Sequence, residues 1–367
     1  MVYLDFSKAF DKVPHRRLVE KFKAHGIAGK VLGWVQAWLT GRQQRTVLNG
    51  EASDWADVDS GVPQGSVFGP LAFVIYINDI DNVTRLITIM NKFADDTKCG
   101  QVIMSPGDIA ILQKCLDDLV DWADKWEMSF NLTKCKVMHV GRTNPMAVYT
   151  MSCHTMDSID FERDIGVKVH KSLRPSLQCS EAANRANAVL GQVSRAFHFR
   201  DRRVFVQLYK QYVRPHLEFA VPAWSPWTQG DKESLEKVQR RAVRMVSGLQ
   251  GDTYEAKLKD LGLLSLEDRR TKYDLVQTFK IIRGFDDVKS DIWFSLVGEN
   301  PARLTRHSND PLNINTRHPR CEIRKNFFSN RVIDKWNYLP SDLKNSVTVT
   351  SFKKKVHDLL TNNYFSH

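Results

Sequence analysis

The sequence predicts an α+β fold, in which a mixed sheet packs on helices in the first half and a mainly helical region follows. Up to about residue 170, runs rich in β-branched and aromatic residues alternate with helical patterns. From about residue 181 to 284, apolar residues recur at helical spacing. The charged residues are also distributed unequally between the halves. Residues 1–190 hold 22 Lys/Arg and 22 Asp/Glu, whereas residues 191–367 hold 31 Lys/Arg and 20 Asp/Glu. The whole net charge of +11 therefore lies in the second half.

The first half contains the predicted strands. Val2–Leu4 is expected to form a buried strand that lies near an exposed sheet edge or a truncated core surface, because almost no chain precedes it. Asn49-Gly50, the commonest hairpin-turn pair, separates two β-rich runs. Thr88–Phe93 is expected to lead into Asp95-Asp96 and to pair with a returning strand at Gln101–Met104. A further strand is predicted at Lys136–Val140.

Helices are predicted from apolar spacing and from start and stop signals in both halves. In the first half they are Arg16–Ala24, Val31–Leu39, a helix ending at Tyr76, and Leu112–Trp126. In the second half they are Ala182–Phe197, Arg202–Phe219, Lys232–Val246, Tyr254–Leu261, Leu266–Arg283, Asn326–Trp336 and Ser351–Leu360. Residues 285–325 show little periodicity. We therefore expect three regions: 1–170, a sheet domain; 171–284, helical; and 285–367, an irregular connection with short closing helices.

Composition excludes several classes of protein. The chain is 42% hydrophobic and 26% charged, which is ordinary for a globular protein and argues against wholesale disorder. Its six cysteines form no CxxC pair, so neither a disulfide scaffold nor a cysteine-rich zinc module is supported. The longest apolar run, Val67–Ile77, is far shorter than the ~20 residues of a membrane span. No secretory leader is expected, because Asp5 interrupts the start.

Three short segments could carry chemistry: the stretch around Asp5, the loop Pro63-Gln64-Gly65, and Asp95-Asp96. Each carboxylate follows a predicted strand, and strand ends can bring Asp5 and Asp95 side by side. Clustered carboxylates repel one another unless a hard cation neutralises them, and Mg²⁺ prefers such oxygen ligands. A pair of such ions would suit phosphoryl transfer.

Each segment alone also has a plain structural explanation. A single aspartate after a strand is commonly a helix N-cap or a turn residue. An Asp-Asp pair is usually a solvated turn, and Pro-Gln-Gly on its own is only a loop. Order and spacing together support the functional interpretation.

The strings LDFSKAFDKVPH, SGVPQGSVFGPLAFVIYINDI and FADDTK resemble three successive motifs of the reverse transcriptases of animal non-LTR retrotransposons (LINE elements), of the jockey-like and chicken-repeat-like groups. The resemblance continues through WADKWEMSFNLTKCKVMHVGR, DIGVKVHKSL, LYKQYVRPHLEFAVPAWSPW, LEKVQRRAVRMVSGL and RKNFFSNRVIDKWNYLP. It implies a palm followed by a mainly helical thumb and C-terminal region. It also implies an RNA-directed DNA polymerase that uses an RNA template, a DNA primer and deoxynucleoside triphosphates.

The resemblance assigns roles to matching positions. Asp5, Asp95 and Asp96 would be the metal-binding carboxylates, with Mg²⁺ the expected ion and Mn²⁺ the alternative. Phe10 would be the steric gate against a ribose 2′-hydroxyl, or else an ordinary core aromatic. Gln64 and Gly65 would belong to the loop that faces the template and the nucleotide. Lys134 would be the candidate proton donor to pyrophosphate, and Gly166 would lie in the turn that supports the primer end. For Lys134 a plain surface lysine fits almost as well.

The sequence departs from the family pattern in the length of the chain before the first motif. Only four residues precede Asp5, whereas a complete enzyme of this type has fingers before that motif and an endonuclease domain further upstream. We therefore expect an N-terminally truncated polymerase that lacks part of its positive cradle for the triphosphate. The fingers and the endonuclease would belong to the full-length element.

The basic excess of the second half favours a nucleic-acid partner over a merely solvated surface. Lys237, Arg240, Arg241 and Arg244 are predicted to share one helix face and to contact phosphates. A second basic group, interspersed with aromatics expected to be core residues, is Arg195, Arg200, Arg202, Arg203, Lys210 and Arg214.

Two functions from different classes remain open: an active RNA-directed DNA polymerase, and a catalytically inactive truncated fragment that binds nucleic acid non-specifically. A group II intron maturase is disfavoured, because the second-half strings resemble LINE elements. The family implies an intracellular and nuclear location without a membrane.

Overall fold

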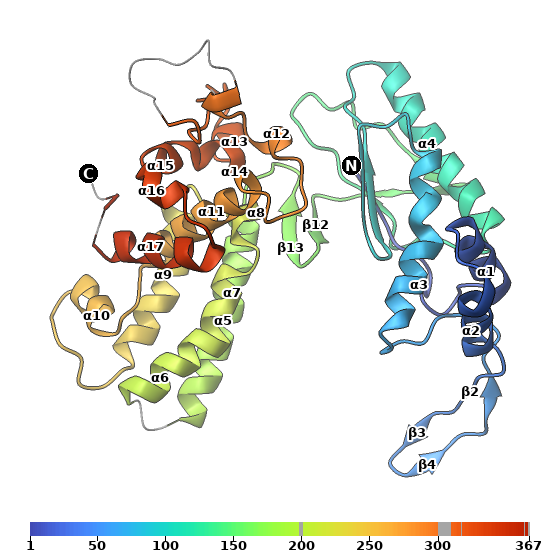
Figure 1. The fold of residues 1–367 in the computed structure, drawn as a ribbon, viewed down its shortest axis with the longest axis horizontal. Helices are drawn as coiled ribbons and strands as arrows, with labels where there is room; N and C mark the ends of the chain where they lie inside the picture. The colour runs from blue at the N-terminus through green and yellow to red at the C-terminus, as the bar shows by residue number, and fades with distance from the viewer. Residues whose placement is uncertain (198–200, 300–309, 317, 363, 366–367) are drawn as a thin grey trace. The chain divides into compact units, whose positions relative to one another are not determined.

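The computed structural model describes residues 1–197, 201–299, 310–316, 318–362 and 364–365. The chain packs as two units, residues 1–165 and residues 166–367 (Figure 1). Within the described ranges, no helix is long and apolar enough to cross a membrane. Arg200, part of the second predicted basic group, lies outside the described residues.

The first unit is built on a five-stranded mixed sheet with the order β11-β8-β1-β7-β6. Its strands are β1 (Val2–Leu4), β6 (Ile89–Phe93), β7 (Asp96–Gly100), β8 (Lys136–Val137) and β11 (Asp157–Ser158). β1 pairs antiparallel with β7 and with β8, so that Val2 lies opposite Cys99 on one side and Val137 on the other. β11 runs parallel to β8. The expectation of an exposed sheet edge at Val2–Leu4 is therefore wrong, because strands from much later in the chain cover both of its edges. The alternative, a truncated core surface, stays a prediction.

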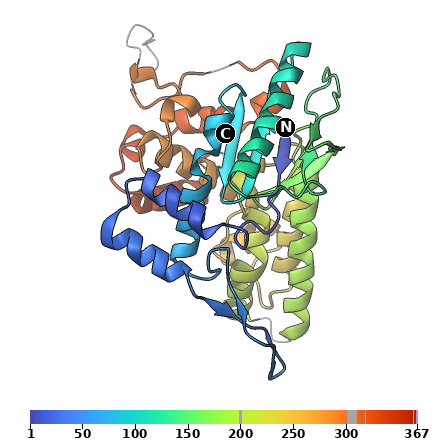
Figure 2. The same cartoon turned by 90° about the vertical axis from the view of Figure 1, so that its right-hand side faces the viewer.

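The two faces of this sheet have different surroundings. Side chains alternate along a strand, and Val2 and Leu4 of β1 are buried together with Thr97 and Cys99 of β7. The helices that share this core are α1 (His15–Ala24), α2 (Gly29–Leu39), α3 (Phe68–Ile77) and α4 (Pro106–Lys125). α3 and α4 cover this packed face of the sheet (Figure 2). The opposite face, which carries Tyr3, is left for polar side chains.

The hairpin at β6 and β7 corrects one expectation. The returning strand is Asp96–Gly100, and Gln101–Met104 is not in a strand. Phe93 pairs directly with Asp96, so Ala94 and Asp95 form a two-residue turn, with Ala94 at φ +54°. The returning strand begins at Asp96 because the turn closes after two residues. The sequence pattern missed it because its inward residues, Thr97 and Cys99, are not strongly apolar.

The predicted Asn49-Gly50 hairpin is confirmed. Asn49 and Gly50 have φ of +51° and +92°, and Leu48 pairs with Glu51 across them. The minor elements of the first unit are β2 (Gln43–Gln44), β3 (Val47–Leu48), β4 (Glu51–Ala52), β5 (Ala56–Asp57), η1 (Asn78–Val83), β9 (Thr150–Met151), β10 (His154–Thr155) and β12 (Phe161–Asp164). Strand β8 is shorter than the predicted Lys136–Val140.

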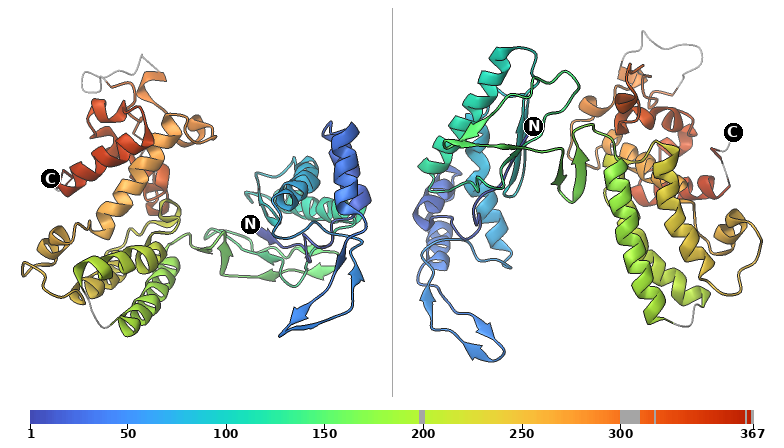
Figure 3. Two further views of the ribbon diagram at one scale, coloured as in Figure 1. Left: turned by 60° about the horizontal axis from the view of Figure 1, so that its bottom comes forward. Right: turned by 180° about the vertical axis from the view of Figure 1, so that it is seen from behind.

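The second unit is mainly helical, as predicted. After β13 (Val167–His170) its larger helices are α5 (Ser176–Ala196), α6 (Arg202–Leu208), α9 (Gln229–Arg244), α10 (Tyr254–Asp260), α11 (Leu266–Ile282) and α17 (Val349–Thr361). The short ones are α7 (Arg214–Glu218), α8 (Val221–Trp224), α12 (Ser290–Trp293), η3 (Val297–Glu299), α13 (Glu322–Lys325), α14 (Phe328–Arg331), α15 (Ile333–Asn337) and α16 (Ser341–Lys344). α5 and α9 lie side by side, and α17 packs on α11 (Figure 3).

Two hydrophobic clusters hold this unit together. One gathers the inward residues of α5 to α9, with Leu190 and Leu235 fully buried. The other surrounds Trp336 and Phe352, and Phe279 of α11 stacks on Phe352 at a centroid distance of 4.2 Å. The division at residues 170 and 284 stays a prediction.

The predicted helix Arg202–Phe219 contains a π-helical segment, η2 (Tyr209–Val213), between α6 and α7. Pro215 at the start of α7 has no N–H to donate to the preceding turn, which favours this irregularity. Residues 285–325 include three short helical pieces among their described residues, and 300–309 and 317 lie outside the described residues.

Candidate active site on the open face of the sheet

Three predicted carboxylates meet at one end of β1 and β7. The antiparallel register pairs Leu4 with Thr97, and its continuation brings Asp5 opposite Asp96. Asp95 occupies the adjoining two-residue turn with Ala94. The pairing of two strands far apart in the sequence thus joins the first and third motifs.

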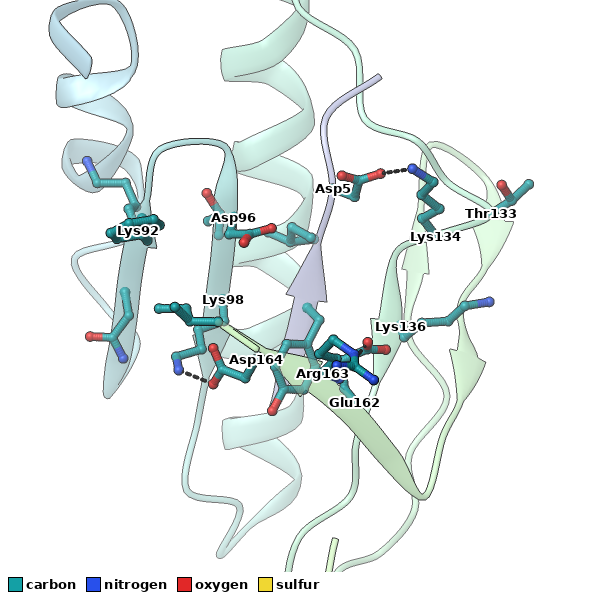
Figure 4. A pocket seen from close by; sticks show the side chains of 16 residues that line it. Asp5, Lys92, Asp96, Lys98, Thr133, Lys134, Lys136, Glu162, Arg163 and Asp164 are labelled. Atoms are coloured by element: carbon teal, nitrogen blue, oxygen red, sulfur yellow. Dashed lines mark hydrogen bonds and ion pairs between the residues drawn. The ribbon is translucent and has the colours of Figure 1, made fainter. Parts of the chain in front are cut away.

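A cavity of about 710 Å³ lies on the open face of the sheet. Asp5, Asp96 and Lys134 are among the residues that line it, as Figure 4 shows. Asp95 is half-buried in the turn and is not among the described lining residues. The cavity therefore brings together three of the four residues expected to carry the chemistry.

Asp5 has an incomplete set of partners. Its Oδ2 lies 3.1 Å from Lys134 Nζ, an ion pair between side chains that are 29% and 67% exposed. The geometry does not amount to a hydrogen bond, and this Oδ2, although buried, accepts none among the described residues. Its backbone, by contrast, is fixed, because Asn131 donates its N–H to the Asp5 carbonyl oxygen at 2.7 Å. A firmly positioned carboxylate is left able to accept a further ligand.

Asp96 lies in a negative environment. Partial burial raises the pKa of Asp96 above its ordinary value, and the charges of Asp95, Asp5 and Asp164 raise it further. Three neighbouring carboxylates thus oppose the ionisation of Asp96. Such an arrangement is unfavourable without a cation, so it predicts affinity for one.

The carboxylate oxygens of this site suit Mg²⁺ or Mn²⁺, provided that water or substrate supplies the remaining ligands. Within the described ranges, no group of three or more His, Cys, Asp or Glu side chains is placed to hold a metal ion by itself. Mg²⁺ is commonly held by only one or two carboxylates, with water and substrate phosphates completing its octahedron. Asp5 and Asp96, with the unbonded Oδ2 of Asp5, fit that requirement.

Two further basic residues of the cavity, Lys98 and Lys136, were not predicted. Lys98 forms an ion pair with Asp164, and Lys136 lies 2.6 Å from Asp157. Tyr3 lies on the same face, where burial and then Asp164 and Glu162 raise its pKa to about 12. The alternation of Tyr3 with buried neighbours could have revealed this face, but Asp164 reaches it only through tertiary packing.

Phe10, Gln64 and Gly65 belong to a neighbouring part of the first unit. Phe10 stacks on Phe73 with ring centroids 4.5 Å apart. Gln64 donates from Nε2 to Asp11 Oδ1 at 2.9 Å, and Gly65 has φ +79°. The loop and the first motif are therefore joined, although none of these three is among the described residues that line the cavity.

The loop that carries Gln64 packs tightly on the first motif. Val62 donates its N–H to the Phe10 carbonyl oxygen at 2.8 Å. A Cβ at Gly61, whose φ is +87°, would lie 2.7 Å from the Asp11 carbonyl oxygen. Glycine is therefore required at position 61 both by its backbone conformation and by this close approach.

The remaining predicted residues belong to the second unit. Gly166 has φ +82°, and a Cβ there would lie 3.1 Å from the Phe219 ring. On α9, Lys237, Arg241 and Arg244 are exposed at helical spacing, whereas Arg240 pairs with Glu233 and lies over the Tyr254 ring. Of the four residues predicted to share this face, three are exposed cations, and the fourth, Arg240, is held in an ion pair.

The second basic group is mixed. Arg195 and Arg203 are exposed, Arg202 pairs with Asp260 at 3.0 Å, Arg214 pairs with Glu218, and Lys210 is half-buried. Phe205 and Tyr209 are core residues, whereas Tyr212 is 55% exposed.

Much of the chain is similar in sequence to known proteins. Residues 1–181 match the family described as reverse transcriptase (RNA-dependent DNA polymerase). A probable RNA-directed DNA polymerase from transposon X-element of Drosophila melanogaster is 23% identical over 334 residues, which are 88% of this chain and 36% of the relative. The RNA-directed DNA polymerase from mobile element jockey of Drosophila funebris is 25% identical over 67% of this chain and 28% of its own length. The chain thus spans about a third of these curated relatives.

Proposed function

Because residues 1–181 belong to the reverse transcriptase family, we propose that the chain carries an RNA-directed DNA polymerase site of the non-LTR retrotransposon type. It would extend a DNA 3′-end along an RNA template with deoxynucleoside triphosphates. The observation that carries the proposal is the β1–β7 register, which sets Asp5 opposite Asp96 and next to the Asp95 turn.

The carboxylates Asp5, Asp95 and Asp96 would hold divalent ions, with Mg²⁺ expected. When bound, such ions neutralise the triphosphate charge and activate the attacking hydroxyl. Lys134 Nζ is 67% exposed and, among the described residues, is paired with Asp5 alone. We assign it the delivery of a proton to the departing pyrophosphate.

The adjoining residues would select and position substrates. Phe10 is held against Phe73, so its ring is rigid enough to act as a steric gate against a 2′-hydroxyl. Gln64 and Gly65 lie in the loop that packs on the same segment and would face the template and the nucleotide. In this scheme the first unit is the palm, the second contains a thumb-like region, and Gly166 supports the primer end.

A second function, nucleic-acid binding without catalysis, is favoured by one observation. Lys237, Arg241 and Arg244 are exposed at i, i+4 and i+7 on α9. A cationic face of this kind contacts phosphates independently of sequence.

A nuclear location of the protein also stays a prediction.

Primer extension on poly(rA)·oligo(dT) with Mg²⁺ tests the proposal. The wild-type chain should extend the primer, and Asp95→Asn/Asp96→Asn should lower the rate by at least ~10²–10³-fold, the loss expected on removal of charge-stabilising groups. Asp121→Asn is the matched control, because Asp121 is exposed on α4, which covers the packed face of the sheet.

Two results would count against catalysis at these carboxylates. Equal extension by the double variant would place the chemistry elsewhere. Absence of extension by the wild-type chain, with salt-sensitive binding of the same duplex retained, would favour the nucleic-acid binder.

A further inference from the structure

A small cavity in the second unit is lined by a buried arginine that has no hydrogen-bond or ion-pair partner among the described residues. The cavity has a volume of about 180 Å³, and segments from the start of α9, from α11 and from α14–α15 enclose it. Arg270 of α11 lines it and is only 5% exposed. Among the described residues the guanidinium takes part in no hydrogen bond or ion pair, and its Nη1 is fully buried.

An unpaired buried guanidinium is costly. The two N–H donors of Nη1 leave water, and neither gains an acceptor from the described residues. Burial lowers the pKa of Arg270, while the charges of Glu236 and Glu267 oppose that change. Neither carboxylate is hydrogen-bonded to it, so the described residues leave its Nη1 unsatisfied.

The carboxylates of the cavity are already engaged by other cations. Asp274 receives hydrogen bonds from Arg331 Nε and Nη2, both at 2.8 Å. The remaining donors of Arg331 are directed to the Pro222 and Asn326 carbonyl oxygens. Glu267 Oε1 lies 2.6 Å from Lys232 Nζ. In each of these two ion pairs the charges cancel, so the positive charge of Arg270 is not balanced by a carboxylate that lines the cavity.

Lys335 adds a second surplus cation to the same cavity. Its Nζ donates to Thr271 Oγ1 at 2.7 Å, and two further N–H donors remain. Summed over the paired and unpaired groups, the lining residues carry an excess of two positive charges: Arg270 and Lys335. A phosphate monoester carries about −1.5 to −2 at pH 7, which matches this excess.

We propose that this cavity is a binding site for a phosphate group, held by the Arg270 guanidinium and the Lys335 ammonium. Arginine is suited to the task, because its planar fork donates two parallel hydrogen bonds to phosphate oxygens. The phosphate comes either from a free ion or from a nucleic acid. The site is separate from the carboxylate cavity of the first unit and does not depend on polymerase activity.

Thermal unfolding of the full chain, with and without sodium phosphate at constant ionic strength, tests the proposal. Phosphate at ~10 times its Kd should raise the Tm of the wild-type chain by about 3–6 °C, beyond the effect of matched sodium chloride. Arg270→Met should abolish this rise. Arg283→Met is the control, because Arg283 is exposed at the end of the same helix and should respond like wild type.

The variant also separates binding from packing. Without phosphate, Arg270→Met should be at least as stable as wild type, because an unpaired buried charge has been removed. If Arg270→Met does not fold, Arg270→Lys and Lys335→Met should each weaken the phosphate response severalfold. An equal rise in wild type and all variants, or no phosphate-specific rise in wild type, would overturn the proposal.

A second arm identifies the source of the phosphate. Binding of a fluorescent single-stranded oligonucleotide that is weakened severalfold by Arg270→Met, and displaced by free phosphate, would identify a nucleic-acid phosphate. Oligonucleotide binding equal in wild type and Arg270→Met, with the phosphate-dependent Tm rise present only in wild type, would identify a free ion.

Discussion

Charged side chains are held in opposite ways in the two units. Two ion pairs of the second unit are buried and complete: the partners are 16% and 11% exposed in Arg331–Asp274, and 1% and 11% in Lys344–Asp310. On the open sheet face of the first unit, Asp5 has one loosely oriented lysine, and Asp96 has mainly other carboxylates around it.

The difference separates charges that support the fold from charges available for function. A buried pair fixes packing, since either partner alone would be an unpaired charge. Carboxylates gathered on an open face gain nothing for the fold and oppose one another. Arg270, by contrast, is a buried charge of the second unit that has no such partner among the described residues, and for this reason it marks a second candidate site.

The largest effect should come from breaking a buried pair. Asp274→Asn leaves the Arg331 guanidinium without its charged partner, and the free energy of unfolding should fall by about 3–5 kcal/mol. Urea denaturation monitored by tryptophan fluorescence measures this decrease. Asp157→Asn breaks the solvent-exposed pair with Lys136 and should leave the curve unchanged. Similar decreases for both variants would remove the contrast between buried and exposed pairs.

Removal of the exposed cations of α9 should affect binding rather than stability. Replacing Lys237, Arg241 and Arg244 by alanine should weaken duplex binding and reduce the slope of log Kd against log salt by about 0.9 for each phosphate that the variant no longer neutralises. Fluorescence anisotropy at several salt concentrations measures both quantities. Arg240→Ala should change the slope less, because Arg240 is engaged by Glu233. An unchanged slope in the triple variant would exclude this face from the interface.

The smallest effect concerns Asp96. Its folded-state pKa is above the ordinary 3.8, so the folded chain binds the proton more readily than the unfolded chain does. Ionised Asp96 therefore opposes folding at neutral pH, and this penalty disappears as the pH falls through the raised pKa toward 3.8. Asp96→Asn should raise the Tm by about 1–2 °C at pH 7.5.

Calorimetric scans at several pH values check the Asp96 prediction. At a pH well below 3.8 the difference between Asp96→Asn and wild type should vanish, because Asp96 is then protonated in both states. A variant less stable than wild type at neutral pH would show that the Asp96 carboxylate supports the fold.

Much of the fold follows from local patterns. α4 was predicted because Leu112, Leu116 and Leu119 recur on one face, and these residues are buried. β7 was placed too late, because its inward Thr97 and Cys99 lack the apolar character of a typical core strand. The central place of β1 could not be predicted, since it depends on pairing with two strands about 95 and 135 residues away.

The candidate site was predicted in part. The motifs pointed to Asp5, Asp96 and Lys134, which line one cavity. Lys98 and Asp164 also line it but were missed, because only the folded sheet brings β7 and β12 together. Arg270 carried no local signal, since an arginine on a helix is ordinarily exposed.

Mn²⁺ binding, measured by electron paramagnetic resonance in the presence of a deoxynucleoside triphosphate, tests most directly whether the open-face carboxylates act together. Asp5→Asn and Asp96→Asn should each reduce the protein-bound Mn²⁺ signal severalfold, whereas Asp121→Asn should leave it at the wild-type level. Equal Mn²⁺ binding by all four chains would contradict the account, because the gathered carboxylates would then not form a cation site.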